Sequence, residues 1–405
     1  MDISAQYLEG GTEARRVSPA EARLRLRDAF QRVPLSMVLL GWDLDPRVVE
    51  ACADECSRHD CDLYLWQPTL TAHGAFSGDP SWYVVGLSGE PAAGLDGKPE
   101  FSFICPNRAE ARERILQNLS EAIAGGDYQG VFLDRIRFPS PAYDLAGQFA
   151  CFCDACRAVA GAAGLELAAV QENLRELLLS REGRRAAVLA MLAPIPPRET
   201  EAAGQLPRQM LEFRQRSVGR MVDEITGAAH AGGLKVGLDC FSPTLTRMVG
   251  QDLPTLAKSC DWIKVMTYTR AFAPASLPYE VVGLVNWLMS MKGETEQEAL
   301  EWFAGATGWS LPRSLEAIRS HGLAGAVLTQ ELQRGRAAKP RQLLAGIELV
   351  EMPEVVQLSP QQIEADAEAV LAGAPDGAVF SWDLRRIPAE RLELAASLYG
   401  DPSRR

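Results

Sequence analysis

Three carboxylates stand near the ends of short apolar runs. Asp134 ends the run Gly-Val-Phe-Leu-Asp, Asp239 lies in Lys-Val-Gly-Leu-Asp, and Glu348 ends Leu-Leu-Ala-Gly-Ile-Glu. A charged side chain between apolar neighbours is costly to desolvate unless it is paired or takes part in chemistry. Glycoside hydrolysis needs two carboxyls, one protonated to assist the leaving oxygen and one ionised as nucleophile or base. Asp134 and Glu348 are the first candidates for these two roles.

The identity of the second carboxylate stays open at this point. Glu351 lies three residues beyond Glu348 and competes with it, because the chain there could already be loop. Asp239 is the other catalytic candidate: it could orient Asp134, replace Glu348, or form an ion pair with Lys264 inside the sheet. A structural ion pair is also an ordinary explanation for Glu348.

Aromatic and polar side chains near the same run ends are candidates for holding a sugar. Aromatic rings pack on sugar faces, and planar guanidinium groups bind hydroxyls or carboxylates. The predicted substrate-binding residues are Trp42, Asp43, Trp66, Arg137, Lys264, Tyr268, Trp382 and Asp383. Each ring could instead belong to the core, the two aspartates could cap the helices that follow them, and Arg135 or Arg137 could simply balance Asp134.

Two other functions fit some of these residues. A desolvated Lys264 could form a Schiff base, which would make the protein a lyase or aldolase. A barrel that binds carbohydrate without catalysis would need only the aromatic rings and polar groups.

Three cysteines fall within six residues. Cys151, Cys153 and Cys156 form Cys-Phe-Cys-Asp-Ala-Cys, and Cys105 ends another apolar run, Phe-Ser-Phe-Ile-Cys. Four thiolates that converge on one ion form a structural zinc site, so we predict bound Zn²⁺ with these four ligands. Buried or redox-reactive thiols are the alternative. The remaining cysteines lack such spacing and are expected to be buried as small apolar side chains: Cys52, Cys56, Cys61, Cys240 and Cys260.

The elements that must position these residues alternate between strand and helix. Eight β-rich runs are predicted at 36–42, 62–66, 101–105, 130–134, 234–241, 261–268, 343–350 and 377–382. Amphipathic helical patterns separate most of them, for example at 108–124 and 211–231. Alternation of this kind indicates a parallel sheet, and eight units favour an α/β fold of the (β/α)₈ TIM-barrel type.

Two connections are much longer than is usual in such barrels. They span about 138–210 and 271–341, follow the fourth and sixth strands, and are rich in Ala, Leu, Glu and Arg, which predicts helical insertions. Residues 68–100 are rich in Gly and Pro and are expected to form an ordered loop over the barrel mouth. We read residues 1–405 as one elaborated barrel domain.

Two resemblances to known families rest on these motifs. Cys-Pro-Asn at 105–107 followed by CFCDACRAVA at 151–160 resembles the four-cysteine zinc site of family 42 β-galactosidases, which are (β/α)₈ barrels with a structural zinc. The enzymes of that family place their two catalytic carboxyls at the ends of strands four and seven, so the resemblance implies Asp134 as the acid/base and Glu348 as the nucleophile or base. The family carries Asn-Glu at the end of strand four, where this chain has Leu133-Asp134-Arg135. YQGVFLDRIRFP, KVGLDCFSP and DWIKVMTY resemble the strand ends of glycoside-hydrolase-like barrels. The Met-x-Tyr part is similar to chitinase-type barrels, although their acid motif is absent and only its last Asp has a counterpart, in Asp134.

Charge and composition narrow the possible partners. The chain has 405 residues, 41 basic and 53 acidic, and a net charge of −12, which disfavours nucleic acid and anionic membranes as partners. No targeting segment or long apolar run is found, and the nine cysteines suit a reducing compartment, so we expect a cytoplasmic protein. The expected partner is a small carbohydrate substrate, and a homo-oligomer stays open.

Overall fold

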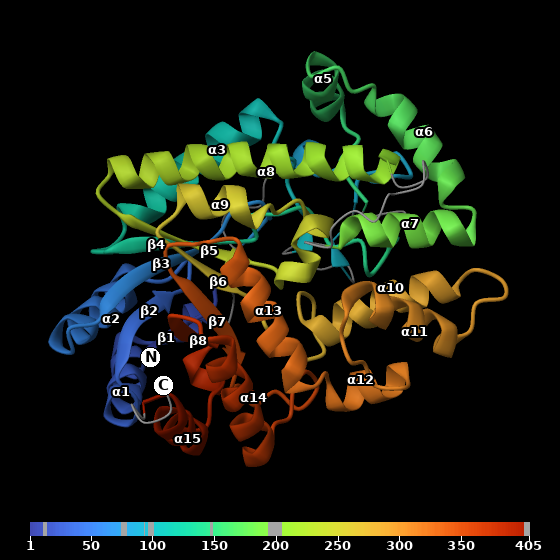
Figure 1. Cartoon of the computed structure of the whole chain (residues 1–405). Coiled ribbons are helices and arrows are strands. Elements are labelled where there is room, and N and C mark those ends of the chain that lie inside the picture. Colours follow the sequence, from blue (N-terminus) through green and yellow to red (C-terminus); the bar gives the residue numbers. More distant parts are fainter. Residues whose placement is uncertain are drawn as a thin grey trace.

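The computed structural model describes residues 1–10, 14–73, 79–92, 94–95, 101–145, 149–192 and 205–400. Eight parallel strands close into a barrel in which each strand pairs with the next and β8 pairs with β1 (Figure 1). The strands are β1 Asp2–Tyr7, β2 Leu35–Leu40, β3 Asp62–Pro68, β4 Gly130–Asp134, β5 Lys235–Cys240, β6 Trp262–Val265, β7 Leu343–Glu348 and β8 Gly377–Ser381. The predicted (β/α)₈ barrel is confirmed.

Helices surround the barrel and also form the long connections. They are α1 Pro19–Arg32, α2 Pro46–Arg58, α3 Ala109–Ile123, α5 Asp154–Ala162, α6 Leu167–Leu177, α7 Arg181–Met191, α8 Gln205–Ala231, α9 Leu253–Ser259, α10 Leu277–Met289, α11 Glu296–Thr307, α12 Leu315–His321, α13 Gly325–Ala337, α14 Pro360–Gly373 and α15 Ala389–Gly400. Several helices begin at a residue that the sequence marks clearly. Ser18, Thr295 and Ser359 each form a capping box with the residue three positions later, which satisfies free N–H groups of the first turn.

One of the eight predicted strands is wrong. Residues 101–105 do not join the barrel; they lie in the connection between β3 and β4, where Phe103 bridges Thr71 and Ile104 bridges Tyr83 in antiparallel pairs. The run is apolar because the connection packs on the barrel and buries Ile104 completely. Residues 74–78, 93 and 96–100 of the expected loop over the mouth lie outside the described residues.

The missing strand is β1, at the N-terminus. Its sequence alternates strictly, with Ile3, Ala5 and Tyr7 buried against the helix layer and Ser4 and Gln6 on the other face. That second face points into the barrel, so the polar residues of β1 line the barrel interior while its apolar residues pack against the helices. This inversion of the usual pattern hides the strand from a search for apolar runs.

Large rings fill the barrel interior, and two glycines make room for them and for a lysine. A Cβ on Gly237 would lie 2.1 Å from the Trp262 ring, and a Cβ on Gly346 would lie 2.8 Å from Cε of Lys264. Trp262 in turn stacks on Phe132, with ring centroids 5.1 Å apart. The barrel is therefore a packed core with its polar groups gathered toward the carboxyl ends of the strands.

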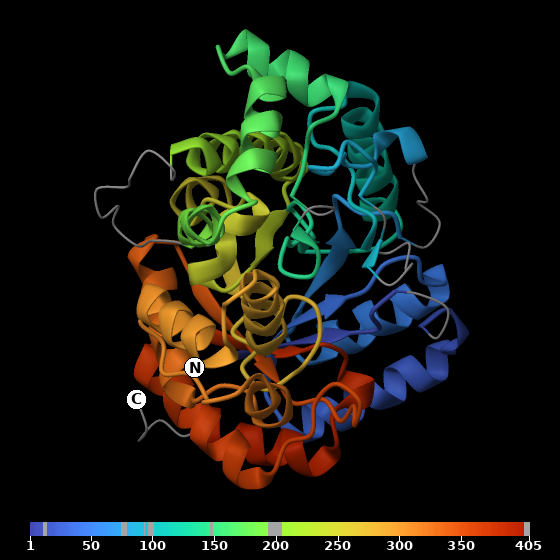
Figure 2. The ribbon, with the colours of Figure 1, turned by 90° about the vertical axis from the view of Figure 1, so that its right-hand side faces the viewer.

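The two predicted helical insertions are present. The connection after β4 contains α5, α6, α7 and α8, and the connection after β6 contains α10 to α13, while residues 193–204 of the first lie outside the described residues. The insertions contact each other: Arg184 of α7 donates to the Trp287 carbonyl of α10 at 2.8 Å. Helices α10 to α12 lie on the right of Figure 1 and therefore face the viewer in Figure 2.

Among the helices of the described ranges, none combines the length and the apolar character that crossing a bilayer requires. This agrees with the composition, which offers no long apolar run.

Candidate active site

Asp134 is the last residue of β4 and is only 7% exposed. Its Oδ2 accepts a hydrogen bond from Nε1 of Trp66 at 3.1 Å, and its Oδ1 accepts one from the backbone N–H of Arg135 at 2.5 Å. The Arg135 guanidinium lies 4.0 Å from Oδ2. The two N–H donors hold the Asp134 carboxyl in one orientation, and a guanidinium group lies close to it.

Asp239 lies beside Asp134 on the neighbouring strand. Leu133 of β4 pairs with Leu238 of β5, and each aspartate is the next residue along its strand. Asp239 is 3% exposed; its Oδ2 accepts from Nζ of Lys264 at 3.0 Å, whereas its Oδ1 has no hydrogen-bond partner among the described residues. Burial raises the pKa of Asp239 to about 7, against the opposing effect of Lys264.

Lys264 is fully buried in the centre of the barrel. Its Nζ donates to Asp239 and, at 3.1 Å, to Oε1 of Gln6 from β1, and it lies 5.3 Å from the Tyr268 ring centroid. Burial alone would lower the pKa of Lys264, but the Asp239 carboxylate and Tyr268 raise it. The side chain is therefore held as an ammonium ion.

Glu348 ends β7 but turns toward the loop that follows β6. Its Oε2 accepts from the backbone N–H groups of Thr269 and Arg270, both at 3.1 Å, and its Oε1 accepts from that of Ala271 at 2.7 Å. Burial raises the pKa of Glu348 to about 8, although these bonds oppose the rise. The competing candidate, Glu351, is exposed and lies 4.0 Å from a guanidinium nitrogen of Arg391.

The four predicted aromatic residues form two pairs. The rings of Trp42 and Trp66 meet nearly at right angles with centroids 5.3 Å apart, and those of Tyr268 and Trp382 lie 5.2 Å apart. The Tyr268 hydroxyl donates to Oγ of Ser381 at 2.9 Å. Trp382 is half-buried and the other three rings are almost fully buried, so Trp382 is the ring of the four best placed to touch a ligand.

Asp43 and Asp383 are occupied by contacts of their own. Asp43 forms an ion pair with Arg15 at 3.3 Å. Asp383 accepts from the backbone N–H of Arg385 at 3.0 Å, pairs with its guanidinium at 2.6 Å, and accepts from the N–H of Leu8 at 3.3 Å. Asp383 thus acts as the helix cap that the sequence allowed as its alternative role.

Arg137 is buried between two aromatic rings. Its guanidinium carbon lies 4.5 Å from the Phe103 centroid and 4.6 Å from the Phe241 centroid, and its Nη1 donates to the Phe138 carbonyl at 3.1 Å. Burial lowers its pKa to about 10, which still leaves it charged at neutral pH. Its buried Nε has no partner among the described residues, so this group has an unused donor.

Two residues of the site were missed because β1 was missed. Gln6 shares the Lys264 ammonium with Asp239, and Oε1 of Glu9, just beyond β1, lies 3.9 Å from Nη2 of Arg135. The strict alternation of Asp2–Tyr7 was the available signal for this strand.

The four predicted cysteines come together. The Sγ atoms of Cys105, Cys151, Cys153 and Cys156 all lie within 4.8 Å of one another, and all four residues are buried. Cys105 lies 3.4 Å from Cys156 and 3.6 Å from Cys153. A tetrahedral ion with metal–sulfur bonds of about 2.3 Å requires sulfurs roughly 3.8 Å apart, so this donor set fits a metal ion.

Donors around the cluster suit thiolate ligands. Backbone N–H groups of Val85 and Asn107 point at Sγ of Cys151 and Cys105, at 3.3 and 3.4 Å, and the Asn107 side chain donates to Cys156 at 3.2 Å. Contacts of this kind stabilise the negative charge on ligand sulfurs. Cys105 belongs to the connection before β4 and the other three cysteines to the connection after it, so the cluster joins two segments that are far apart in the sequence.

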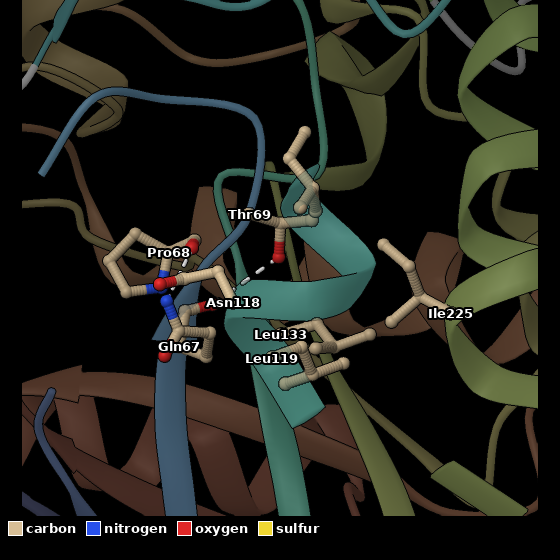
Figure 3. A pocket seen from close by; sticks show the side chains of 8 residues that line it. Gln67, Pro68, Thr69, Asn118, Leu119, Leu133 and Ile225 are labelled. Atoms are coloured by element: carbon tan, nitrogen blue, oxygen red, sulfur yellow. Dashed lines mark hydrogen bonds between the residues drawn. The ribbon is translucent and has the colours of Figure 1, made fainter. Parts of the chain in front are cut away.

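A small cavity on the helix side of the sheet is a poor candidate for the site. It has a volume of about 10 Å³ and lies between β3 and β4 and the helices α3 and α8, where Leu133 and Ile225 line it (Figure 3). Its polar groups satisfy one another: Nε2 of Gln67 donates to the Pro68 carbonyl, and the Thr69 hydroxyl donates to the Gln67 carbonyl. Such a volume holds about one water molecule and no sugar.

Solved structures share the architecture. The chain is similar to the catalytic domain of a β-amylase from Paenibacillus polymyxa, with a TM-score of 0.55, 11% identity and 98% of each chain covered. It is also similar to the PgaB (BpsB) glycoside hydrolase domain from Bordetella bronchiseptica, with a TM-score of 0.52, 12% identity and coverage of 98% of this chain and 99% of that one. A third is α-L-fucosidase isoenzyme 2 from Paenibacillus thiaminolyticus, with a TM-score of 0.51, 12% identity and coverage of 99% of this chain and 49% of that one.

The chain is thus a closed (β/α)₈ barrel, and it shares this fold with the solved structures named above. No family model matches the sequence, and no curated protein is significantly similar to it. At these identities the likeness establishes the fold, and the chemistry has to be argued from the site.

Proposed function

We propose that the protein is a glycoside hydrolase that acts on a small soluble glycoside or an oligosaccharide. The observation that carries this proposal is the pair of buried carboxyls, Asp134 and Asp239, on neighbouring strands at the barrel mouth. Their surroundings differ: Asp134 is held by two N–H donors, whereas Asp239 has an elevated pKa and one oxygen without a partner among the described residues. Two carboxyls with unequal surroundings are what acid and base roles require.

The surroundings also suggest which carboxyl has which role. A carboxyl with a pKa near 7 carries its proton for part of the time at neutral pH and can donate it to a leaving oxygen, so we assign Asp239 as general acid. Asp134, an acceptor for two N–H groups, is assigned as nucleophile or base. The sequence alone favoured Asp134 as acid/base, and the hydrogen bonds described above support the reverse order.

Asp239 is favoured over Glu348 as the second carboxyl because Glu348 already accepts three backbone N–H groups. We expect Asp239→Asn to lower kcat by at least about a hundredfold, and Glu348→Gln to act mainly on stability, because it removes the acceptor for part of the loop after β6. Initial rates and thermal unfolding of both variants check this. A Glu348→Gln protein that is folded but inactive, beside an active Asp239→Asn protein, would reverse the assignment.

The pH dependence follows from the sign of the Asp239 shift. Catalysis needs Asp239 protonated, so kcat/KM should fall as pH rises through about 7, by ~tenfold per pH unit on the basic limb. The measurement is a pH profile of kcat/KM between pH 4 and 9. If Asp239 had the pKa of an exposed aspartate, kcat/KM would already fall at much lower pH. A value of kcat/KM that stays constant from about pH 6 to 9 would contradict the assignment.

The reaction class is tested by a substrate screen. Purified protein is incubated with aryl glycosides and with neutral oligosaccharides of several linkages, and released reducing ends are measured. We expect hydrolysis of at least one glycoside, and tight binding without turnover would identify the alternative, a non-catalytic carbohydrate-binding barrel. The Schiff-base lyase or aldolase is disfavoured because Lys264 donates to Asp239 and Gln6, and it is held as a non-nucleophilic ammonium ion whenever Asp239 is ionised.

We further propose that the cysteine cluster holds a structural zinc ion. Four sulfur ligands leave no open coordination position, which is typical of zinc sites that stabilise folds and do not catalyse. The cluster would fasten the connections on either side of β4, the strand that carries Asp134.

A further inference from the structure

We infer that a second sugar-binding subsite lies beside the two carboxyls, where the two helical insertions meet, and that the substrate is therefore a neutral oligosaccharide. This inference rests on the proposed glycoside hydrolase function and names the substrate class of the same site. Three features support it: a cavity, a buried pair of polar side chains and an exposed aromatic ring. Of the residues predicted for the site, only Arg137 lines this cavity.

The cavity lies at the junction of three segments of chain. It has a volume of about 30 Å³, and its lining combines rings with a cation and an anion: Phe101, Phe103, Arg137, Tyr143, Tyr279 and Glu280. The residues come from the connection before β4, the connection after β4 and the first turn of α10. Ser140 of one insertion donates to Glu280 of the other, which fixes the two against each other.

The floor of the cavity offers a donor and an acceptor. Arg137 is 5% exposed, and its buried Nε has no partner among the described residues. Glu280 is 1% exposed and accepts from Ser140 and, at 2.9 Å, from the backbone N–H of Ala275. A buried N–H that lacks a partner costs free energy, and a ligand oxygen would remove that cost. One sugar hydroxyl could accept from Arg137 and donate to Glu280.

The balance of charge on this floor indicates a neutral ligand. One guanidinium and one carboxylate face the same cavity, so an anionic sugar would be attracted by Arg137 and repelled by Glu280. A hydroxyl group uses both, because it is donor and acceptor together.

The rim of the cavity presents an exposed aromatic ring. Tyr143 is 52% exposed, one of the few large apolar side chains in the described ranges with that much contact with solvent. Its ring is parallel to that of Tyr279 within 3°, with centroids 6.3 Å apart, and Tyr279 also contacts Phe272. A fixed aromatic face at the rim of a polar cavity is suited to the apolar face of a pyranose ring.

The size and position of the cavity define how the sugar binds. A volume of about 30 Å³ holds two or so water-sized groups, so a hydroxyl or hydroxymethyl group enters it while the ring lies across Tyr143. Arg137 follows Asp134 by three residues, and its guanidinium carbon lies 4.6 Å from the ring centroid of Phe241, which is two residues beyond Asp239. The subsite therefore adjoins the carboxyls, and a substrate that fills both positions has at least two sugar units.

The test compares Tyr143→Ala with Leu179→Ala. Leu179 is 76% exposed and lies just after α6, outside the cavity lining, so it matches Tyr143 as an exposed apolar residue. For each protein, kcat/KM is measured on an aryl monosaccharide and on the longest neutral oligosaccharide that the wild type cleaves. We expect the ratio of long to short to fall about tenfold in Tyr143→Ala and to stay at the wild-type value in Leu179→Ala. An unchanged ratio in Tyr143→Ala overturns the inference.

A binding measurement separates failure of the subsite from failure of the proposed function. Calorimetric titration of neutral di- to hexasaccharides is carried out on proteins that also carry Asp134→Asn, so that no turnover is needed. Affinity that rises with chain length and is weakened by Tyr143→Ala supports the subsite even if no hydrolysis is ever detected. If Tyr143→Ala leaves the affinity unchanged, or if the protein binds none of these sugars, the inferred subsite is overturned.

Discussion

Replacing Asp134 by Asn is expected to lower kcat by about three orders of magnitude or more on whichever glycoside the protein hydrolyses. The substitution replaces a carboxylate by a neutral amide, which cannot act as nucleophile or base toward the sugar. Loss of a nucleophile or base lowers kcat by about this much. The amide has one acceptor oxygen where the carboxylate has two, so it keeps only one of the bonds from Trp66 and the Arg135 N–H. A loss of stability of about 1–2 kcal/mol accompanies the loss of activity.

The matched control is Trp66→Phe. It removes the indole donor to Asp134 but keeps the carboxylate, so it should cost a similar amount of stability and far less of the rate. Initial rates and thermal unfolding are measured on both variants. If Asp134→Asn keeps a kcat close to that of Trp66→Phe or of the wild type, the carboxylate itself has no special role, and the assignment of Asp134 fails.

Removal of one of the four clustered cysteines, the proposed zinc ligands, is expected to have the largest effect on stability. Cys153→Ser should reduce the bound metal to well below one ion per chain. Binding of a structural zinc contributes roughly 10 kcal/mol or more to folding, and we expect the substitution to remove several kcal/mol of this from the free energy of unfolding. The cluster joins segments on both sides of β4, and its loss frees them together. Elemental analysis and thermal unfolding, with and without a chelator, measure both effects.

Cys260→Ala is the control for a buried cysteine outside the cluster. Cys260 is 1% exposed, and its thiol donates to the Leu256 carbonyl, so its loss should lower stability and leave the metal content at about one ion per chain. A wild-type protein that contains no metal, or a Cys153→Ser protein as stable as the wild type, would contradict a structural zinc.

Much of the fold could be predicted from the sequence because parallel strands buried on both faces leave long apolar signals. Seven of the barrel strands follow such runs, and the ion pair between Asp239 and Lys264 that the sequence offered is present. β1 was missed because its inner face is polar, whereas 101–105 is apolar for a different reason, burial beneath a long connection. Burial is visible in the sequence, but what covers a buried segment is not.

The candidate site was less predictable, because it depends on where side chains turn after the strands end. Glu348 ends β7 as expected, yet backbone N–H groups of the loop after β6 donate to its carboxylate, and no spacing in the sequence reveals that loop. The clustering of the four cysteines was predictable because three of them lie within six residues, and such close spacing is itself a signal. Tyr143 and Glu280 had no such signal, since they meet only when two insertions fold against each other.

The most direct test of a glycoside hydrolase is to run the reaction in water enriched in heavy oxygen. Hydrolysis places one solvent oxygen on the sugar, so mass spectrometry of the released reducing sugar should show one heavy oxygen per bond cleaved. The signal should disappear in Asp134→Asn. A product formed without solvent oxygen would indicate elimination or aldol cleavage, and it would contradict the hydrolytic role assigned to Asp134 and Asp239.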